Sequence, residues 1–408
     1  IEAHSFPTRR SSDLTITKKQ AALRATILDK LYAKAPLSRI DIAKETGITP
    51  ATTGSIIGDL IRQELVYEVG EAEDDTVGRK KTLLSLMPHR AYYLGVEISE
   101  KYLALVITDN LGEIQASNYC MTFQELGNYP TSADLADFMH QFMAQYPDFP
   151  LTAIGVGLPG HVDFDLSPYI QSNNQHWQNL NLEELAQAFS LPVYFDNKSH
   201  CLTLAQRLYG QDDKNDHNFI VFHVAHGIHC SYMYQGQIYG RQNFLIGEIG
   251  HTILNPQGEA CTCGKRGCLQ VYASEASLIA KAQTLYRVAQ STFLPSLVSE
   301  PEVITLATIM DACALGDTSC LQLVQQACHY LSIALSNLSQ LIDSDAIYLD
   351  GQFFSYPLVD TLLHQELAAT TPLFHKQKKI RLIPLAYSPL NIARAATSLC
   401  VKANFLSA

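Results

Sequence analysis

The sequence lacks long hydrophobic runs, and few of its residues are charged. No stretch of about 18 apolar residues occurs, so no membrane-spanning helix is predicted. The first residues are rich in arginine and serine and contain no apolar core. We therefore expect no signal peptide and a cytoplasmic protein. In that compartment the ten cysteines are expected to be reduced thiols unless they bind a metal.

The net charge of −11 disfavours general nucleic-acid binding, but the charge is unevenly spread. Residues 15–90 carry 12 Lys and Arg against 10 Asp and Glu, so the acidic excess lies in the rest of the chain. This asymmetry permits DNA contact by the N-terminal part. A chain of 408 residues is too long for one small core, and two or three domains are expected.

Three cysteines and one histidine gather in the second half of the chain. The run begins Gly-Glu-Ile-Gly-His251 and continues to Cys261, Cys263 and Cys268. Three thiols and one imidazole complete a tetrahedral zinc site with no position open for water, so the site would hold structure and not catalyse. Two glycines between Cys263 and Cys268 suit a tight turn with positive φ. Free thiols or a disulfide are the alternatives, but three cysteines within eight residues favour a metal.

This motif resembles the signature of the ROK family, which comprises repressors, open reading frames and sugar kinases. The resemblance runs from about residue 17 onward and is strongest to the NagC/Mlc-type branch of sugar-responsive repressors. It implies an N-terminal winged helix-turn-helix at 15–88 and an α/β body at 89–408. That body would have two lobes of the actin-like/hexokinase type, with a Zn²⁺ knuckle in 247–270. Residues 1–14 match nothing in the family and are expected to be an artefactual or disordered tail.

Local sequence signals favour the winged helix-turn-helix. Ser38 and Asp41 have the spacing of a capping box, and Gly47 suits a tight turn. Thr49 followed by Pro50 is typical of the start of a third helix. Apolar runs at 65–69 and 82–86 predict the two strands of a wing. A three-helix domain that binds protein is the alternative.

The start of the third helix is expected to meet base edges, while the helix before it and the wing hold phosphates. The candidate DNA contacts are Arg39, Lys44, Thr49, Ala51, Thr52, Thr53, Ser55, Arg79 and Lys80. The wing tip lacks the proline that family repressors often carry there. A double-stranded operator with two half-sites requires two such heads, so a homodimer or a dimer of dimers is expected.

The body is predicted to contain two α/β halves. Three antiparallel strands are expected within 93–121, followed by a helix at about 131–146 and a strand at 151–158. The second half would add strands at 193–195, at 218–224 and from 228, with a helix at 199–209. Long helices at about 317–342 and 389–403 would complete it.

Three features that a ROK kinase needs are altered. The first phosphate loop, of Asp-x-Gly-Gly-Thr type in the family, reads Glu97-Ile-Ser-Glu-Lys101 and has no glycine. The second phosphate loop retains one glycine, Gly227. The aspartate that would follow Asn197 and take the proton from the sugar hydroxyl is Lys198. A lysine with an ordinary pKa is protonated at neutral pH and cannot act as that base, so we expect no kinase activity.

The sugar site is also altered, and what remains defines a candidate effector cleft. The resemblance implies that Glu248 holds sugar hydroxyls, while Gln270 replaces the usual glutamate. The candidate cleft residues are Asn173, Asn197, Lys198, Glu248 and Gln270. One expectation is that Lys198 and Glu248 pair and plug the cleft. The other is that Lys198, His200 and His226 receive an anionic effector such as a sugar phosphate.

Three further histidines raise the question of a second metal site. They are His223, His226 and His229. Because Gly227 interrupts the strand, we expect His223 and His229 to point in opposite directions, and no metal is predicted there.

These observations together predict a sugar-responsive transcriptional regulator, a repressor of genes for carbohydrate uptake or catabolism. The effector would be a sugar or sugar phosphate that prefers one arrangement of the DNA-binding heads. Two alternatives stay open. One is an ATP-dependent sugar kinase with an acquired N-terminal domain, and the other is an interaction protein regulated by a partner from the phosphotransferase system.

Overall fold

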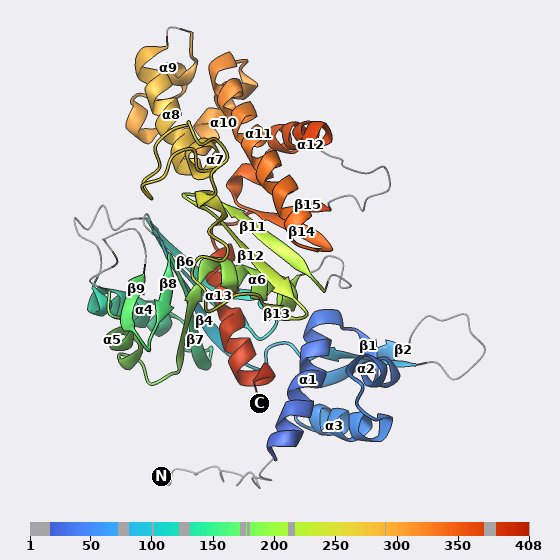
Figure 1. Cartoon of the computed structure of the whole chain (residues 1–408). Helices are drawn as coiled ribbons and strands as arrows, with labels where there is room; N and C mark the ends of the chain where they lie inside the picture. The colour runs from blue at the N-terminus through green and yellow to red at the C-terminus, as the bar shows by residue number, and fades with distance from the viewer. Residues whose placement is uncertain are drawn as a thin grey trace. The chain divides into compact units, whose positions relative to one another are not determined.

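A computed structural model describes residues 17–71, 81–99, 102–121, 131–171, 177, 180–210, 217–289, 291–370 and 381–407 (Figure 1). The chain divides into two units. One holds the residues up to Arg90 together with those from Val401 onward, and the other holds Ala91–Cys400. The last eight residues thus group with the N-terminal unit, whereas the sequence assigned them to the body. The tail expected at 1–14 lies outside the described residues.

The first unit contains three helices, α1 (Lys18–Lys34), α2 (Arg39–Thr46) and α3 (Pro50–Arg62). The predicted capping box is present, because the Ser38 side chain accepts from the Asp41 amide and Asp41 reaches back to Ser38. Gly47 ends α2 in the left-handed conformation, with φ of +70°. Thr49 then caps α3 through the Thr52 amide. Each helix therefore begins where a side chain satisfies its first free backbone N–H groups.

A small sheet completes the first unit. Its strands are β1 (Leu37–Ser38), β2 (Val66–Glu71) and β3 (Thr82–Leu86), in the order β1-β3-β2. The predicted wing strands therefore pair antiparallel, with Val66 opposite Leu86. A π-helical turn, η5 (Lys402–Leu406), also belongs to this unit, and the Phe405 ring lies 6.4 Å from that of Tyr32.

The second unit begins with a mixed five-stranded sheet ordered β10-β7-β4-β5-β6. Strands β4 (Tyr92–Ile98), β5 (Tyr102–Asp109) and β6 (Ile114–Met121) form the predicted antiparallel meander, while β7 (Leu151–Leu158) and β10 (Val193–Asn197) run parallel to β4. Helices α4 (Ser132–Gln145) and α5 (Leu182–Gln187) pack against the sheet over a buried core that includes Phe142 and Trp177.

A second five-stranded sheet has the order β13-β12-β11-β14-β15. Its strands are β11 (Phe219–Val224), β12 (Ile228–Tyr234), β13 (Gln237–Ile238), β14 (Ala346–Asp350) and β15 (Leu382–Pro384). Its core is shared with helices that follow in the chain, which are α7 (Gln270–Ala273), α8 (Glu275–Val288), α9 (Leu294–Leu297), α10 (Leu306–Ala314), α11 (Thr318–Leu341) and α12 (Pro357–Thr370). Short pieces are β8 (His161–Asp163), β9 (Ser167–Gln171), η2 (Ile249–His251), η3 (Pro301–Val303) and η4 (Gln352–Ser355).

Two helices lie beside the sheets, α6 (Lys198–Tyr209) and α13 (Asn391–Val401). Helix α13 crosses the first sheet at Gly95 of β4 and Gly155 of β7. A Cβ at either glycine would collide with the carbonyl oxygen of Ala393 or Ala396. Bare backbone on the sheet therefore allows this close approach. Strand β10 leads directly into α6, which places Asn197 and Lys198 at the carboxyl edge of the sheet.

Candidate functional site

The four candidate metal ligands lie together in the second unit. All four ligand atoms of His251, Cys261, Cys263 and Cys268 lie within 4.8 Å of one another. A tight loop brings the thiols together, since the Cys261 amide donates to the Lys265 carbonyl and the Gly264 amide to Cys261. The two glycines of this loop, at 264 and 267, have φ of +86° and +70°, which confirms the conformation expected from the sequence.

The spacing of these atoms fits a tetrahedral metal. The Cys263 and Cys268 sulfurs are 3.7 Å apart, and the Cys261 sulfur lies 3.6 Å from His251 Nδ1. A regular tetrahedron with metal–sulfur bonds of about 2.3 Å has sulfur–sulfur edges of about 3.8 Å. The nine cysteines in the described part of the chain are free thiols, so no disulfide competes for these sulfurs. The group can therefore bind a metal.

A large cleft of about 1690 Å³ lies next to the metal cluster in the same unit. Its lining includes four of the predicted effector residues, which are Asn197, Lys198, Glu248 and Gln270. The fifth, Asn173, lies outside the described residues. Trp177, near it in sequence, is 1% exposed within the core of the first sheet and packs there without lining the cleft.

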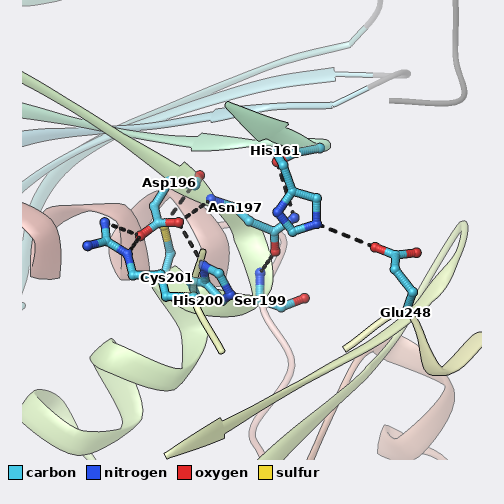
Figure 2. A network of polar contacts seen from close by, with 9 residues as sticks. His161, Asp196, Asn197, Ser199, His200, Cys201 and Glu248 are labelled. Carbon is cyan, nitrogen blue, oxygen red and sulfur yellow. Dashed lines mark hydrogen bonds and ion pairs between the residues drawn. The ribbon is translucent and has the colours of Figure 1, made fainter. Parts of the chain in front are cut away.

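Glu248 lies between two imidazoles. Its Oε1 is 3.5 Å from His161 Nε2 and 3.4 Å from His229 Nδ1. Burial alone would raise the pKa of Glu248, but the two neighbouring histidines outweigh burial and hold the pKa well below its usual value. Phe244 stacks on the His161 ring at 4.7 Å. Figure 2 shows His161 reaching across to Glu248 from the first sheet's side of the cleft.

Lys198 does not pair with Glu248, so the prediction that these two residues form an ion pair in the cleft is wrong. Lys198 Nζ instead donates to Glu97 Oε1 at 2.8 Å. The Tyr102 hydroxyl donates to the same oxygen at 2.9 Å. Glu97 is only 1% exposed, at the end of β4. Lys198 and Glu97 thus neutralise each other, and Glu248 keeps a separate environment.

His200 is also not available to an effector, contrary to the sequence-based expectation. Its Nδ1 lies 2.8 Å from Asp196 Oδ1, and the residue is 7% exposed and does not line the cleft. Arg241 contacts the other Asp196 oxygen, Oδ2, with Nε at 2.9 Å and with a terminal nitrogen at 2.7 Å. Burial would raise the pKa of Asp196, but His200 and Arg241 lower it overall. Figure 2 shows Asp196 and His200 beside Asn197 and Cys201.

The remaining cleft residues have clear local roles. Asn197 caps α6 by accepting from the Ser199 amide, and its Nδ2 donates to the Gly160 carbonyl. Gln270 begins α7 at the wall of the cleft. His223 and His229 sit opposite each other in the β11–β12 pair and both line the cleft, so the expectation that they diverge is wrong. Gly227 lies in the turn between β11 and β12, and the antiparallel pairing beyond the turn puts these cross-strand partners on one face.

Sequence reasoning missed His161, His229 and Glu97 as contacts of the predicted cleft residues. His161 follows the Gly-Leu-Pro-Gly stretch at the carboxyl end of β7. Ligands of open α/β sheets bind at this edge, so that position was the available signal. Glu97 stood at the start of the predicted first phosphate loop, but the sequence did not show that it would contact Lys198, 101 positions away. His229 gave no comparable signal.

The candidate DNA contacts lie in and around α2 and α3. The side chains of Lys44, Thr49, Ala51 and Ser55 are exposed, and Thr52 is half-buried. Arg39 forms an exposed ion pair with Glu68 at 2.9 Å. The prediction that Thr53 contacts DNA is wrong, because this residue is fully buried and its hydroxyl donates to the Ile48 carbonyl. Arg79 and Lys80 lie outside the described residues.

Three comparisons with known proteins bear on this arrangement. Residues 93–383 match the ROK family. The chain is 26% identical over 364 residues to the xylose repressor of Bacillus spizizenii, covering 88% of this chain and 89% of that protein. It is also 26% identical to the DNA-binding transcriptional dual regulator NagC of Escherichia coli, covering 78% of this chain and 77% of that protein.

Solved structures show the same fold. A ROK family transcriptional regulator described as a homologue of the E. coli MLC protein superposes with a TM-score of 0.71, at 24% identity, covering 95% of this chain and 97% of its own. A ROK glucokinase from Streptomyces griseus superposes with a TM-score of 0.65, at 20% identity, covering 76% and 99%. The body therefore has the actin-like/hexokinase-type fold. In the described part of the chain, no helix is both long and apolar enough to cross a membrane.

Proposed function

Because this chain belongs to the ROK family, we propose that it is a sugar-responsive, DNA-binding transcriptional regulator and has no kinase activity. The relatives that it matches over most of their length are named as repressors of xylose or N-acetylglucosamine genes or as a DNA-binding regulator. Repression of genes for carbohydrate uptake or catabolism is the specific role that we assign.

The observation that carries the proposal is the pair formed by Lys198 and Glu97. In a sugar kinase, a carboxylate at position 198 would take the proton from the sugar hydroxyl. Here the position holds a cation whose ammonium already contacts a buried carboxylate at 2.8 Å. A lysine held in an ion pair with a buried carboxylate does not replace the carboxylate that would take the proton. The cleft can therefore bind a sugar but lacks the group that would activate it.

The DNA-binding head is the winged helix-turn-helix formed by α1 to α3 with β2 and β3. The exposed start of α3, with Ala51, Thr52 and Ser55, is the part that reads base edges. Lys44 of α2 is exposed and holds phosphate. Two heads are needed for an operator with two half-sites, so the working form is a homodimer or a dimer of dimers.

The metal is Zn²⁺ in a structural role. Residues His251, Cys261, Cys263 and Cys268 would hold it, and a site with four protein ligands leaves no place for a reacting water. The cluster lies against the cleft, since His251 and Cys263 also line it. Zinc thereby fixes the wall that carries Glu248, three residues before His251.

The test is selection of genomic DNA fragments by the purified, zinc-loaded protein at moderate salt. We expect enrichment of palindromic sites beside carbohydrate genes. Ser55→Glu should abolish the enrichment, because a carboxylate at the start of α3 repels phosphate. Ser339→Glu, on α11 in the other unit, is the matched control and should enrich the same sites. Absence of enrichment by folded, dimeric protein would instead support the alternative of a head that binds protein.

A further inference from the structure

Glu97 lies at one end of the cleft, and its two carboxylate oxygens differ in their contacts. Glu97 Oε1 accepts from Lys198 and from Tyr102. Its Oε2 is buried and has no hydrogen-bond partner among the residues that the structure describes. Glu97 itself is 99% buried but lines the cleft. A buried acceptor left unpaired costs free energy, so this oxygen favours a ligand that offers a donor.

The charges at this end of the cleft select against phosphate. The lining includes three carboxylates near the end of the two sheets, Glu97, Glu275 and Asp350, and Lys198 pairs with the first of them. Asp350 is already bound to His223 at 2.6 Å. A phosphate dianion has no donor for Glu97 Oε2 and would meet like charge. A hydroxyl supplies the donor without adding charge.

Tyrosines form one wall beside Glu97. The rings of Tyr102 and Tyr119 have centroids 4.9 Å apart, and Tyr387, which is 45% exposed, also lines the cleft. Burial and the nearby Glu275 raise the pKa of Tyr387 to about 12, and burial beside Glu97 raises the pKa of Tyr102 above its usual value. These hydroxyls therefore stay neutral. Aromatic faces next to a few fixed polar groups are the lining that orients a ring-shaped, hydroxyl-bearing ligand.

The lining is continuous from Glu248 to Glu97. Glu248 contacts His161, the neighbouring Gly160 carbonyl accepts from Asn197 at 3.2 Å, and Lys198 follows Asn197 in the chain. The volume of 1690 Å³ exceeds the range of about 300–1,000 Å³ that suffices for most small ligands. One ligand can therefore reach both ends if it is longer than a single sugar ring.

We propose that the Glu97 end is a second sugar subsite, so that the effector is an uncharged disaccharide or longer oligosaccharide. One ring lies near Glu248 and His161. The next ring donates a hydroxyl to Glu97 Oε2 and packs against Tyr102, Tyr119 and Tyr387. This assignment rests on the proposed function, in which a sugar enters the cleft. It differs from the sugar phosphate expected from the sequence.

The experiment is isothermal titration of the full-length, zinc-loaded protein with matched probes, which are xylose and xylobiose, glucose and cellobiose, and glucose 6-phosphate. We expect at least one disaccharide to bind about tenfold or more tightly than its monosaccharide. Glu97→Gln should remove that gain while leaving monosaccharide affinity within about twofold. Glu302→Gln, an exposed carboxylate outside the cleft lining, is the control and should keep the gain.

A second variant covers the case in which Glu97→Gln does not fold. Tyr387 is nearly half exposed, so Tyr387→Ala should fold and should also lose the disaccharide gain. The proposal is overturned if no disaccharide exceeds its monosaccharide, if none of the five probes binds, or if glucose 6-phosphate binds most tightly. The selection of operator DNA is carried out without sugar. If it enriches operator sites while no disaccharide binds more tightly than its monosaccharide, only the second subsite is refuted. Lack of enrichment would count against the proposed function itself.

Discussion

At the residue scale, the decisive feature is a cation in the place of a base. The position of Lys198 after Asn197 predicted that this lysine would lie in the cleft, but not that it would pair with Glu97. The carboxylate that it reaches is 101 positions away, at the end of β4, and only the parallel pairing of β4, β7 and β10 brings the two together. Spacing along the chain does not indicate which of the two cleft carboxylates, Glu97 or Glu248, pairs with Lys198.

The ion pair itself gives the first prediction. Lys198→Met should destabilise the protein by about 3 kcal/mol, because it leaves the buried Glu97 carboxylate without its cation. The double variant Glu97→Gln with Lys198→Met should recover most of that loss, since no charge remains uncompensated. Urea unfolding monitored by circular dichroism would measure both. Equal destabilisation in the single and the double variant would contradict the pairing.

Asp196 gives a prediction for pH. Its pKa is lowered in the folded protein by His200 and Arg241, so its stabilising effect is present above its unfolded pKa and is lost as the pH falls through the folded value. Asp196→Asn should therefore cost about 3 kcal/mol at pH 7 and progressively less below about pH 4. Thermal unfolding of both proteins across pH 3–8 tests this. A difference that stays constant with pH would show that the charge of Asp196 contributes nothing.

At the element scale, helix starts and tight turns were predictable because they are local. Ser38 with Asp41, Thr49 with Pro50, and the glycines of the knuckle each act within a few residues, and each has the expected conformation. Long-range placement was not predictable in the same way. The burial of Thr53 on the inner face of α3 and the contact of His229 with Glu248 depend on packing between distant segments.

The cap of α3 gives a prediction at this scale. Thr49→Ala removes the side chain that accepts from the Thr52 amide and should cost about 1 kcal/mol of stability. Because α3 begins at the proposed DNA contact, operator affinity should fall as well. Thr26→Ala, on the exposed side of α1, is the control and should lower neither, since alanine favours a helix more than threonine does. Denaturant titration and operator binding would be measured on both variants. Equal changes in stability for the two variants would contradict a stabilising role of the Thr49 cap.

The knuckle gives a second prediction at this scale. Cys263→Ser should lower the zinc content to well below one per chain and reduce the unfolding temperature, because a structural metal contributes directly to folding. Cys313→Ala, a half-buried thiol on α10 outside the cluster, is the matched control and should keep its zinc. Elemental analysis and calorimetry give the two readouts. Undiminished metal in Cys263→Ser would show that the metal, if present, lies elsewhere.

At the scale of the whole molecule, the proposed regulator has a DNA-binding head and a body that would bind sugar without phosphorylating it. Regulation then requires that the sugar prefer one of two states of the protein that differ in operator affinity. Such regulation does not require phosphoryl transfer to the sugar. The proposed regulatory role therefore requires neither a base at position 198 nor the loop glycines.

The most direct test is operator binding with and without sugar, measured by fluorescence anisotropy on a DNA site recovered by selection. The account predicts that a cleft-binding sugar changes operator affinity by at least about fivefold. Glu248→Gln should keep DNA binding but remove this response, because it changes the carboxylate that His161 and His229 hold ionised. Tight operator binding that no cleft-binding sugar alters would contradict the central claim.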